Sequence, residues 1–309
     1  MMKKKNKAET TGRKNISKTQ DIFNRIIRNR NSVIGFVIAM IIIFAAIFAG
    51  FLVDYETEVI QIDVLNRLQL PSDEHFLGTD ELGRDILARL IYAARMSLLI
   101  GVLSVCFALG IGIVLGSAAG YFGGKVETVI MRICDVFEGI PSFLMAMTIT
   151  AAFGTSLFNL MLAIAIGTFA GQTRIIRGAV LQVKGQEYIE AARALGANNW
   201  QIIFYHIIPN CIATIIVQFS IRVASGILAA SSLSFLGLGV QPPDPEWGAM
   251  LSGGRAYLME NPYLTLYPGA CIMLSILAFN MMGDGLRDAL DPRLKGIVSN
   301  DVWKNESNK

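Results

Sequence analysis

The sequence predicts an all-α, polytopic membrane protein with six transmembrane helices. Apolar residues occupy 53% of the 309 positions, and the mean hydropathy is +0.50. Several apolar runs reach the roughly 20 residues that a helix needs to cross a bilayer. A water-soluble chain of this size cannot bury so much apolar surface, so the composition indicates repeated membrane spans.

The first span is predicted at residues 33–53, after a polar and basic N-terminal segment at 1–32. The apolar run is too long for the core of a signal peptide and lacks a clear cleavage site, so we expect it to be retained. The other five spans are predicted at 98–120, 125–152, 157–171, 212–236 and 264–282.

Two of these spans carry packing signals. Small residues recur every four positions in the second span, which predicts close approach of another helix backbone rather than a substrate path. These residues are Ser104, Ala108, Gly112, Gly116 and Gly120. The third span is interrupted at Gly139 and Pro141, where we expect a static kink rather than a hinge.

The distribution of Lys and Arg predicts the orientation. With the N-terminus inside, 21 of the 27 basic residues fall on the cytoplasmic side and 5 on the external side. The positive-inside rule then places both termini in the cytoplasm, including the tail at 286–309. The loop at 54–97 lies outside under this assignment. Its basic residues say less about the orientation, because the positive-inside rule applies mainly to short loops.

The external segments have scaffold-like patterns. Thr79 or Asp80 is expected to cap a helix that runs into Ile86 and Ile91 and forms an amphipathic elbow on the outer membrane surface. The proline-rich run at 241–245 excludes a helix and predicts a stiff external turn. Contact with an extracellular binding protein is the second interpretation of both segments.

The chain shows no residues for ATP, metal or covalent chemistry. Residues 251–255 read LSGGR, which resembles an ATPase signature loop, but the predicted topology places them outside. The pair Gly124-Lys125 lacks the leading glycine and the following Ser or Thr of a phosphate-binding loop. The four cysteines and two histidines have no metal-ligand spacing. We therefore expect no enzyme activity and no cofactor in this chain.

The cytoplasmic loop at 187–209 has the most informative pattern. It predicts a short helix, a glycine stop at Gly196 and a second helix capped by Asn198. Glu187 and Glu190 lie where the helix dipole favours acidic groups. One apolar face of small residues suits entry into a groove on a partner, although an ordinary amphipathic connector is the alternative. This face comprises Tyr188, Ala191, Ala192 and Leu195.

The loop also carries a family resemblance. The run from Glu190-Ala191-Ala192 through Gly196 to Pro209 resembles the EAA loop of binding-protein-dependent ABC import permeases, with His206 and Ile208 departing from its usual pattern. Four further stretches resemble the second permease subunit of oligopeptide, dipeptide and nickel importers. They are HFLGTDELGRD at 75–85, SFLGLGVQPP at 234–243, WGAMLSGGR at 247–255 and GDGLRDALDPRLK at 283–295.

The resemblance, which runs from the first span to about residue 295, implies a type I ABC importer membrane domain with a core permease domain at 98–285. It implies a heterodimer with a homologous permease, two cytoplasmic ATPases that hold ATP and magnesium, and a solute-binding protein. Residues 187–209 would couple the ATPases to alternating access. The remaining contacts would be with membrane lipid, and we expect no nucleic-acid partner.

Two questions stay open at this stage. A peptide substrate is favoured because the peptide branch of the family is broader, and a nickel chelate is the alternative. A secondary transporter is a lower alternative and would use ionisable groups at membrane depth. The candidate at that depth is Arg222, which we group with Ser225 and Ser231 as a translocation path.

Overall fold

The computed structural model describes residues 26–27 and 29–290, and within them every regular element is helical. The N-terminal segment and the C-terminal tail of the sequence prediction therefore lie largely outside the described residues. Five helices are long and apolar enough to span a membrane, and a bent pair supplies the sixth span. They are α2 (Arg30–Leu52), α3 (Ile86–Phe122), the pair α4 (Gly124–Glu138) and α5 (Ser142–Phe153), α6 (Leu157–Lys184), α9 (Ile208–Phe235) and α11 (Tyr263–Leu290).

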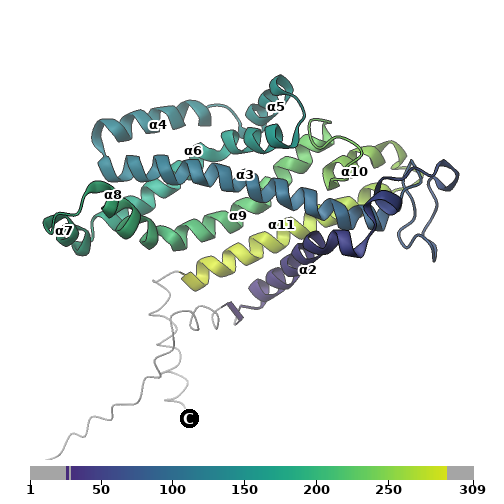
Figure 1. The fold of residues 1–309 in the computed structure, drawn as a ribbon, viewed down its shortest axis with the longest axis horizontal. Helices are drawn as coiled ribbons and strands as arrows, with labels where there is room; N and C mark the ends of the chain where they lie inside the picture. Colours follow the sequence, from purple (N-terminus) through teal and green to yellow (C-terminus); the bar gives the residue numbers. More distant parts are fainter. Residues whose placement is uncertain (1–25, 28, 291–309) are drawn as a thin grey trace, which may run out of the picture.

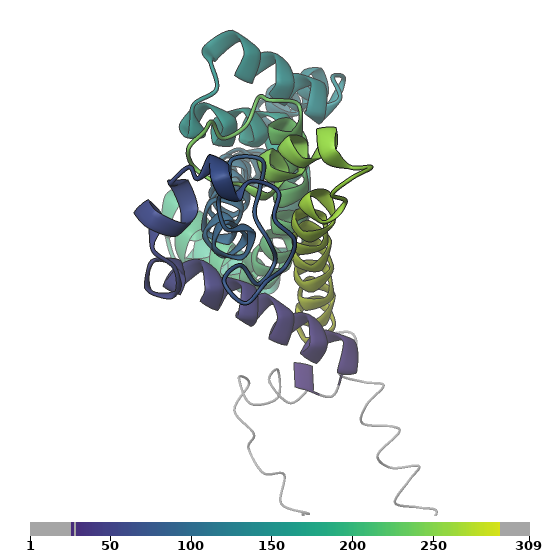
Figure 2. The same cartoon turned by 90° about the vertical axis from the view of Figure 1, so that its right-hand side faces the viewer.

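The helices form an elongated bundle around α3, α6 and α9. Figure 1 shows α4 and α5 on one long side of these helices and α2 and α11 on the other, and Figure 2 shows the same order from one end. The short helices α7 (Glu187–Ala194) and α8 (Asn199–Gln201) lie at one end of the bundle, while α10 (Trp247–Gly254) lies toward the opposite end. The candidate coupling loop and the external motifs are thus far apart.

Small residues allow α3 to pack directly on α6, as the four-residue spacing predicts. A Cβ added at Gly112 would lie 2.8 Å from the Cβ of Gln172, and one at Gly116 would lie 2.7 Å from the carbonyl oxygen of Thr173. Side chains larger than hydrogen at these positions would force the two helices apart. The stripe is therefore a packing surface.

The third span is broken at the predicted place. The axes of α4 and α5 differ by 81°, and Pro141 lies between them. Proline cannot donate a backbone hydrogen bond and clashes with the preceding turn, which accounts for the break. Arginines of α6 hold α4 in place, because Arg174 pairs with Asp135 at 2.5 Å and Glu138 at 2.7 Å, and Arg177 pairs with Glu127.

Two of the predicted spans are too short at the end next to the loop at 187–209. The fourth continues from Gly171 to Lys184, and the fifth is preceded without interruption by helix from Asn199 onward. Arg174 and Arg177, which the sequence prediction assigned to a loop, therefore lie on α6. A 28-residue helix is about 42 Å long, so α6 exceeds the hydrocarbon thickness of about 30 Å and its last turns extend beyond it.

The external elbow differs from the prediction in two respects. Asp85, rather than Thr79 or Asp80, caps the helix by accepting from the backbone N–H of Ala88 at 2.8 Å. The helix then continues without a break from Ile86 into the second span, so the elbow is not a separate element. Asp80 instead lies buried, 2.7 Å from the guanidinium of Arg84.

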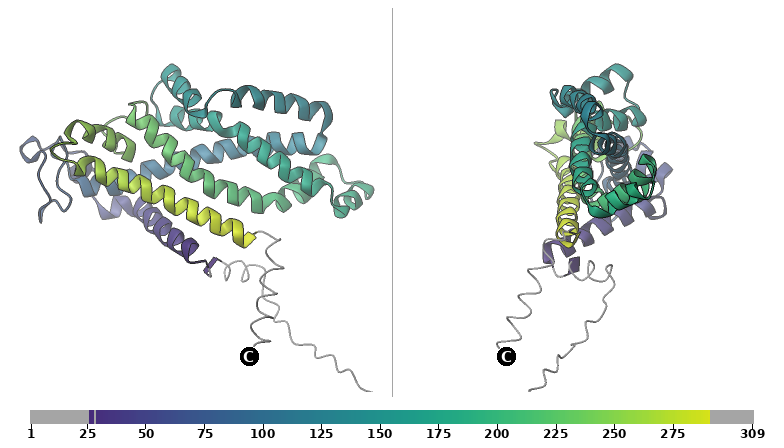
Figure 3. Two further views of the ribbon diagram at one scale, coloured as in Figure 1. Left: turned by 180° about the vertical axis from the view of Figure 1, so that it is seen from behind. Right: turned by 90° about the vertical axis from the view of Figure 1, so that its left-hand side faces the viewer.

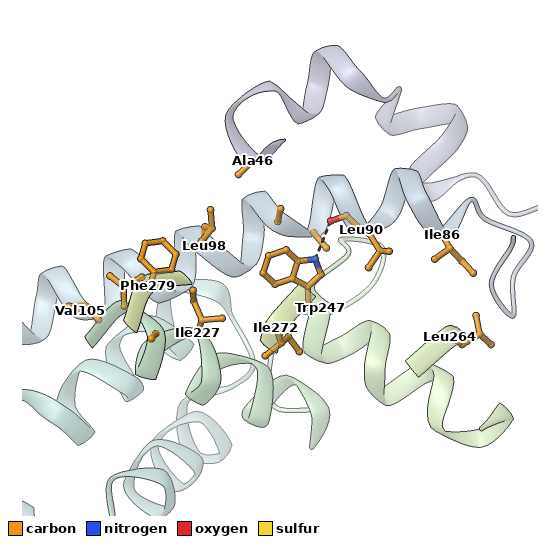
Figure 4. Packing of buried hydrophobic residues seen from close by; sticks show 14 residues of the cluster. Ala46, Ile86, Leu90, Leu98, Val105, Ile227, Trp247, Leu264, Ile272 and Phe279 are labelled. Carbon is orange, nitrogen blue, oxygen red and sulfur yellow. Dashed lines mark hydrogen bonds between the residues drawn. The ribbon is translucent and has the colours of Figure 1, made fainter. Parts of the chain in front are cut away.

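Helix α10 is held against α3 by Trp247. The indole is 2% exposed and donates from Nε1 to the carbonyl of Leu90 at 3.1 Å (Figure 4). Helix α2 closes the far side by running antiparallel to α11, and the views in Figure 3 show these two helices side by side. Ser32 of α2 meets Gly285 of α11, where a Cβ would lie 2.2 Å from the serine oxygen.

Candidate coupling loop and outward face of helix α9

The loop between α6 and α9 begins with the predicted short helix and glycine stop. Gly196 has φ of +88° and follows Leu195, the C-cap residue of α7. Its N–H donates to the carbonyl of Arg193 at 3.0 Å, and the N–H of Ala197 donates to that of Ala192 at 3.1 Å. These two bonds form a Schellman motif, which requires a left-handed residue at the position of Gly196.

The second helix of the loop begins where the sequence predicts. The side chain of Asn198 accepts from the N–H of Gln201 at 2.8 Å, and the Gln201 side chain accepts from the N–H of Asn198 at 2.9 Å. This reciprocal capping box satisfies two donors that a helix start leaves free. Asn198 therefore fixes the direction in which the chain leaves the loop.

Pro209 does not end the loop, contrary to the prediction, but lies in the first turn of α9. Residues 202–207 form a π-helical turn, in which the N–H of Ile208 donates to the carbonyl of Ile203. Proline supplies no N–H and crowds the preceding turn of a regular α-helix. The wider turn at 202–207 accommodates this residue within a continuous helix.

The predicted apolar face of α7 points away from the chain. Leu195 is 88% exposed and Tyr188 is 43% exposed, while Ala191 is exposed and Ala192 is half-buried. Glu187 and Glu190 are also exposed. Apolar side chains of this loop are thus presented to the surroundings and not packed into the bundle.

One buried residue anchors α7, and the sequence analysis missed it. Ile189 is 1% exposed and belongs to a cluster of apolar side chains from α3, α6 and the turn at 202–207. Ile189 lies off the predicted apolar face, which begins at Tyr188 and continues at Ala191, so the helical period gave no reason to select it. Its burial fixes the loop to the bundle while the opposite face stays free.

Tyr121 ties the end of α3 to this loop. Its hydroxyl donates to the side-chain oxygen of Asn199 at 2.8 Å. The Nζ of Lys184 lies 5.8 Å from the centre of its ring, and the Cζ of Arg193 lies 5.9 Å from it. One aromatic side chain thus contacts α6, α7 and α8, which makes the loop continuous with the body of the bundle.

Exposed aromatic side chains surround the same end of the bundle. The ring of Trp200 lies 6.4 Å from that of Phe122 and 6.1 Å from that of Phe204. Trp200 is 63% exposed and Tyr205 is 75% exposed. Tryptophan and tyrosine concentrate at membrane–water boundaries. The three aromatic residues at positions 200–205 were the feature of the sequence from which this aromatic boundary could have been predicted.

The three residues grouped as a translocation path do not share one face of α9. Arg222 and Ser231 are nine residues apart, which is about half a helical turn in rotation. Ser231 is 5% exposed and donates toward Glu246 at 3.3 Å inside the bundle. Arg222 is half-buried and Ser225 is exposed. Ser231 therefore does not lie beside Arg222, although it contributes to the lining of the hollow between α5, α9, α10 and α11.

Arg222 lies in the middle of α9 and about 20 Å along the axis from either end of that helix. Within residues 29–290 its guanidinium has no hydrogen bond or ion pair. A charge at membrane depth requires water or a polar partner. We therefore expect Arg222 to face water or a polar group that the described part of the chain does not supply.

Glu246 is a fully buried carboxylate at the start of α10. It is 0% exposed, and its carboxylate accepts from Ser97 at 3.0 Å and from the N–H of Ala249 at 2.9 Å. With Ser231 these contacts join α3, α9 and α10 at one point. A single glutamate in a proline-rich stretch gave no pattern from which to predict this role.

Tyr55 holds the segment at 54–85 against the proline-rich turn. Its hydroxyl donates to Asp244 at 2.5 Å, and its ring lies 4.7 Å from that of Tyr92. Burial, followed by the hydrogen bond to Asp244, raises the pKa of the Tyr55 phenol above its ordinary value. The phenol stays protonated and remains a donor throughout the physiological range.

No metal site is present among residues 26–27 and 29–290, because no three His, Cys, Asp or Glu side chains gather there. The two arginine–carboxylate sites between α4 and α6 are closed ion pairs. The candidate surfaces are the exposed loop at 187–209 and the side of α9 that carries Arg222.

Two family models match the sequence. Residues 112–296 match the binding-protein-dependent transport system inner membrane component, and residues 17–71 match the N-terminal TM domain of oligopeptide transport permease C. Together they cover the loop at 187–209, α9 and the first span.

Three curated relatives are similar along nearly their whole length. The chain is 44% identical to the dipeptide transport system permease protein DppC of Alkalihalophilus pseudofirmus, with 91% of each chain covered. It is 43% identical to the glutathione transport system permease protein GsiD of Pectobacterium atrosepticum, with 89% of this chain and 91% of that protein covered. It is 42% identical to the di/tripeptide transport system permease protein DppC of Pseudomonas aeruginosa, with 91% and 94% covered.

Solved structures share the fold at low sequence identity. A chain of the inward-facing MetNI methionine ABC transporter aligns with a TM-score of 0.54 and 17% identity, covering 66% of this chain and 96% of that chain. A chain of an amino acid ABC transporter aligns with a TM-score of 0.51 and 18% identity, covering 65% and 94%.

Proposed function

The chain belongs to the family of binding-protein-dependent transport system inner membrane components, and from this we infer that it is the permease subunit of an ATP-driven importer of short peptides. The observation that carries this function is 42–44% identity, over about nine-tenths of the chain, to permeases named for dipeptides, di/tripeptides and glutathione. These relatives support a peptide rather than the alternative of a nickel chelate.

The chain itself is not an ATPase. In this family of permeases ATP is hydrolysed by separate subunits, so ATP and magnesium belong to partner chains. The family also implies a solute-binding protein as a partner. We propose in addition that a homologous permease forms the other half of the transmembrane pore as a heterodimer.

The protein is a multi-pass membrane protein of the cell membrane. We propose that both termini and the loop at 187–209 face the cytoplasm, and that α10 and the segment 54–85 face outward. The Lys and Arg asymmetry supports this orientation. The bundle supports it too, because the loop and α10 lie at opposite ends (Figure 1).

The loop at 187–209 is proposed to dock on one ATPase and transmit its closure. This docking is supported by the exposure of Tyr188 and Leu195, while the neighbouring Ile189 is buried and holds the loop to the bundle. Pro209, now within α9, links the docking surface to the pathway rather than ending it. Such a loop can drive alternating access only if its contacts differ between the two states of the transporter.

The proposed function is tested with the complete complex in proteoliposomes. Uptake of a labelled di- or tripeptide should require ATP, both permeases and the binding protein, whereas a nickel chelate should not be taken up. Nickel uptake without peptide uptake would overturn the substrate assignment. Co-purification of two ATPase chains with this subunit would exclude a secondary transporter.

A further inference from the structure

Three aromatic rings form a continuous exposed surface at the end of the bundle that carries the loop at 187–209. The ring of Phe122, at the end of α3, lies 6.4 Å from that of Trp200, which stacks on Phe204 at 6.1 Å. The three side chains are 43%, 63% and 58% exposed, respectively, so they contact one another without entering the core. We call these three rings the aromatic platform.

Two basic side chains lie beside the aromatic platform. The Nζ of Lys184 and the Cζ of Arg193 lie 5.8 Å and 5.9 Å from the centre of the Tyr121 ring, which itself lies 5.2 Å from that of Phe122. Neither basic group forms an ion pair with another residue of the described ranges, 26–27 and 29–290. An apolar surface and two uncompensated cations are therefore contiguous.

Arg193 lies on the anchored side of α7. It is four residues after the buried Ile189, and residues four apart share one face of a helix. The exposed apolar residues Tyr188 and Leu195 lie elsewhere around this helix. The charge of Arg193 is thus directed to the side of the bundle and is separate from the surface proposed to dock on an ATPase.

The basic and aromatic groups are ordered by depth. A Cβ added at Gly120 of α3 would lie 2.8 Å from Val180 of α6, so these two residues are level with each other. Lys184 is four residues beyond Val180, which is about 6 Å further toward the end of the bundle. The chain runs back from Trp200 through Phe204 into α9, so Phe204 is the deeper of the two. The platform therefore extends inward from the cations.

The length of α3 places the aromatic platform at a membrane surface. Tyr92, near the start of α3, and Phe122, at its end, are thirty residues apart, which is about 45 Å along the helix axis. A bilayer with its headgroups is about 40–45 Å thick, and aromatic residues concentrate at both of its boundaries. The two ends of α3 therefore reach the two surfaces of the bilayer, and the short helices α7 and α8 lie at one of them (Figure 1).

We propose that the aromatic platform, together with Lys184 and Arg193, binds an anionic phospholipid of the adjacent leaflet, which is the cytoplasmic one in the orientation proposed above. The two cations bind the phosphate, and the rings contact the upper part of an acyl chain. A phospholipid fits because its anionic and apolar parts follow each other in the same order of depth. A water-soluble ATPase would have to pass the cations and enter the bilayer to cover Phe204.

The bound lipid would hold the segment that follows the glycine stop. Asn199 receives the hydrogen bond of Tyr121, and Trp200 is the next residue in the chain. The lipid would thus contact the loop at 187–209 on the side opposite its exposed apolar residues. This inference concerns lipid recognition and does not depend on which solute the transporter carries.

The test places the complete complex in phosphatidylcholine vesicles with a trace of phosphatidylglycerol that carries a photoreactive diazirine in its acyl chain. After illumination, the wild type should carry the lipid on peptides that contain Phe122, Trp200 or Phe204. Added phosphatidylglycerol should displace the probe, whereas the same amount of uncharged phosphatidylethanolamine should not. Equal displacement by the two lipids would overturn the proposal.

Substitutions separate the contribution of the two cations. Lys184→Gln and Arg193→Gln should each weaken labelling about fivefold, as expected for the loss of one cation beside an anionic lipid, and Lys184→Arg should retain it. Arg132→Gln is the control, because it removes a cation that is 81% exposed on α4, and it should leave labelling unchanged. Full labelling of the double variant Lys184→Gln/Arg193→Gln would overturn the proposal.

A second measurement identifies the molecule that covers the rings. Photoreactive benzoylphenylalanine in place of Trp200 should crosslink to phospholipid when the complete complex is illuminated in the same vesicles. Capture of an ATPase chain or of the other permease from this position would overturn the assignment to a lipid. Neither experiment measures transport, so both outcomes are independent of the proposed import of peptides.

Discussion

The hydroxyl of Tyr121 donates a 2.8 Å hydrogen bond to the side-chain oxygen of Asn199, which joins the last turn of α3 to the first turn after the glycine stop. The two residues are 78 positions apart in the sequence. Through this bond the candidate coupling loop is attached to a helix that also lines the centre of the bundle.

Tyr121→Phe should weaken transmission from the loop without unfolding the bundle. The substitution removes one hydrogen bond, worth about 1 kcal/mol, and keeps the ring that Lys184 and Arg193 approach. Peptide uptake per ATP hydrolysed should fall while the complex still assembles. Tyr205→Phe is the control, since Tyr205 is 75% exposed, and unchanged coupling in Tyr121→Phe would show that the bond is dispensable.

Gly196→Val should impair uptake more than Gly196→Ala. At φ of +88° any Cβ is strained by about 1–2 kcal/mol, and a β-branched side chain adds further crowding. The strain is purely local, because nothing lies within 4 Å of the added Cβ. Uptake and ATPase association in membranes measure the effect, with Gly185→Ala as a control at negative φ. Normal uptake by Gly196→Val would make the loop a simple connector.

Glu246→Ala should destabilise the external half of the protein. It leaves Ser97, Ser231 and the N–H of Ala249 without their shared acceptor, which costs about 3 kcal/mol. Glu246→Gln keeps the size and one acceptor oxygen, so its loss should be smaller. The melting temperature of the complex in detergent tests this order. Equal melting temperatures for the two variants would refute the role of the carboxylate.

Single cysteines should report the orientation in a chain whose four native cysteines are replaced. An impermeant thiol reagent applied outside should label a cysteine at Met259 and not one at Asn198. Met259 is 95% exposed, whereas Ser252 at the same end is half-buried and bonded to the carbonyl of Phe235 at 2.8 Å, so Met259 is the cleaner reporter. The reverse labelling would invert the proposed topology.

The sequence predicted the spans well wherever apolar residues were continuous. Residues 33–53 and 264–282 fall within or beside α2 and α11, and Pro141 marked the broken span. The end of α6 was missed by 13 residues, because Gln172, Arg174 and Arg177 interrupt the apolar run. Those residues stay helical through tertiary packing and ion pairs with α4, which hydropathy cannot show.

The loop was more predictable than the path. Gly196 and Asn198 act through their own backbone and neighbours, so local rules were sufficient. Ser231 was grouped with Arg222 by proximity in sequence, although a rotation of about half a turn separates them. Helical periodicity alone would have corrected that grouping. The partnership of Glu246 with Ser97 spans 149 positions and required the fold.

The helical run from Asn199 to Phe235 is unbroken, so a tilt at one end would be transmitted along its whole length to the other end. Its 37 residues extend for about 55 Å at 1.5 Å per residue. A tilt of about 10° around its middle, near Arg222, would displace each end by about 5 Å in opposite directions. A movement of a docked ATPase at the Asn199 end would thus displace the Phe235 end by a similar distance. Residues near Arg222, at the middle of the helix, would hardly move.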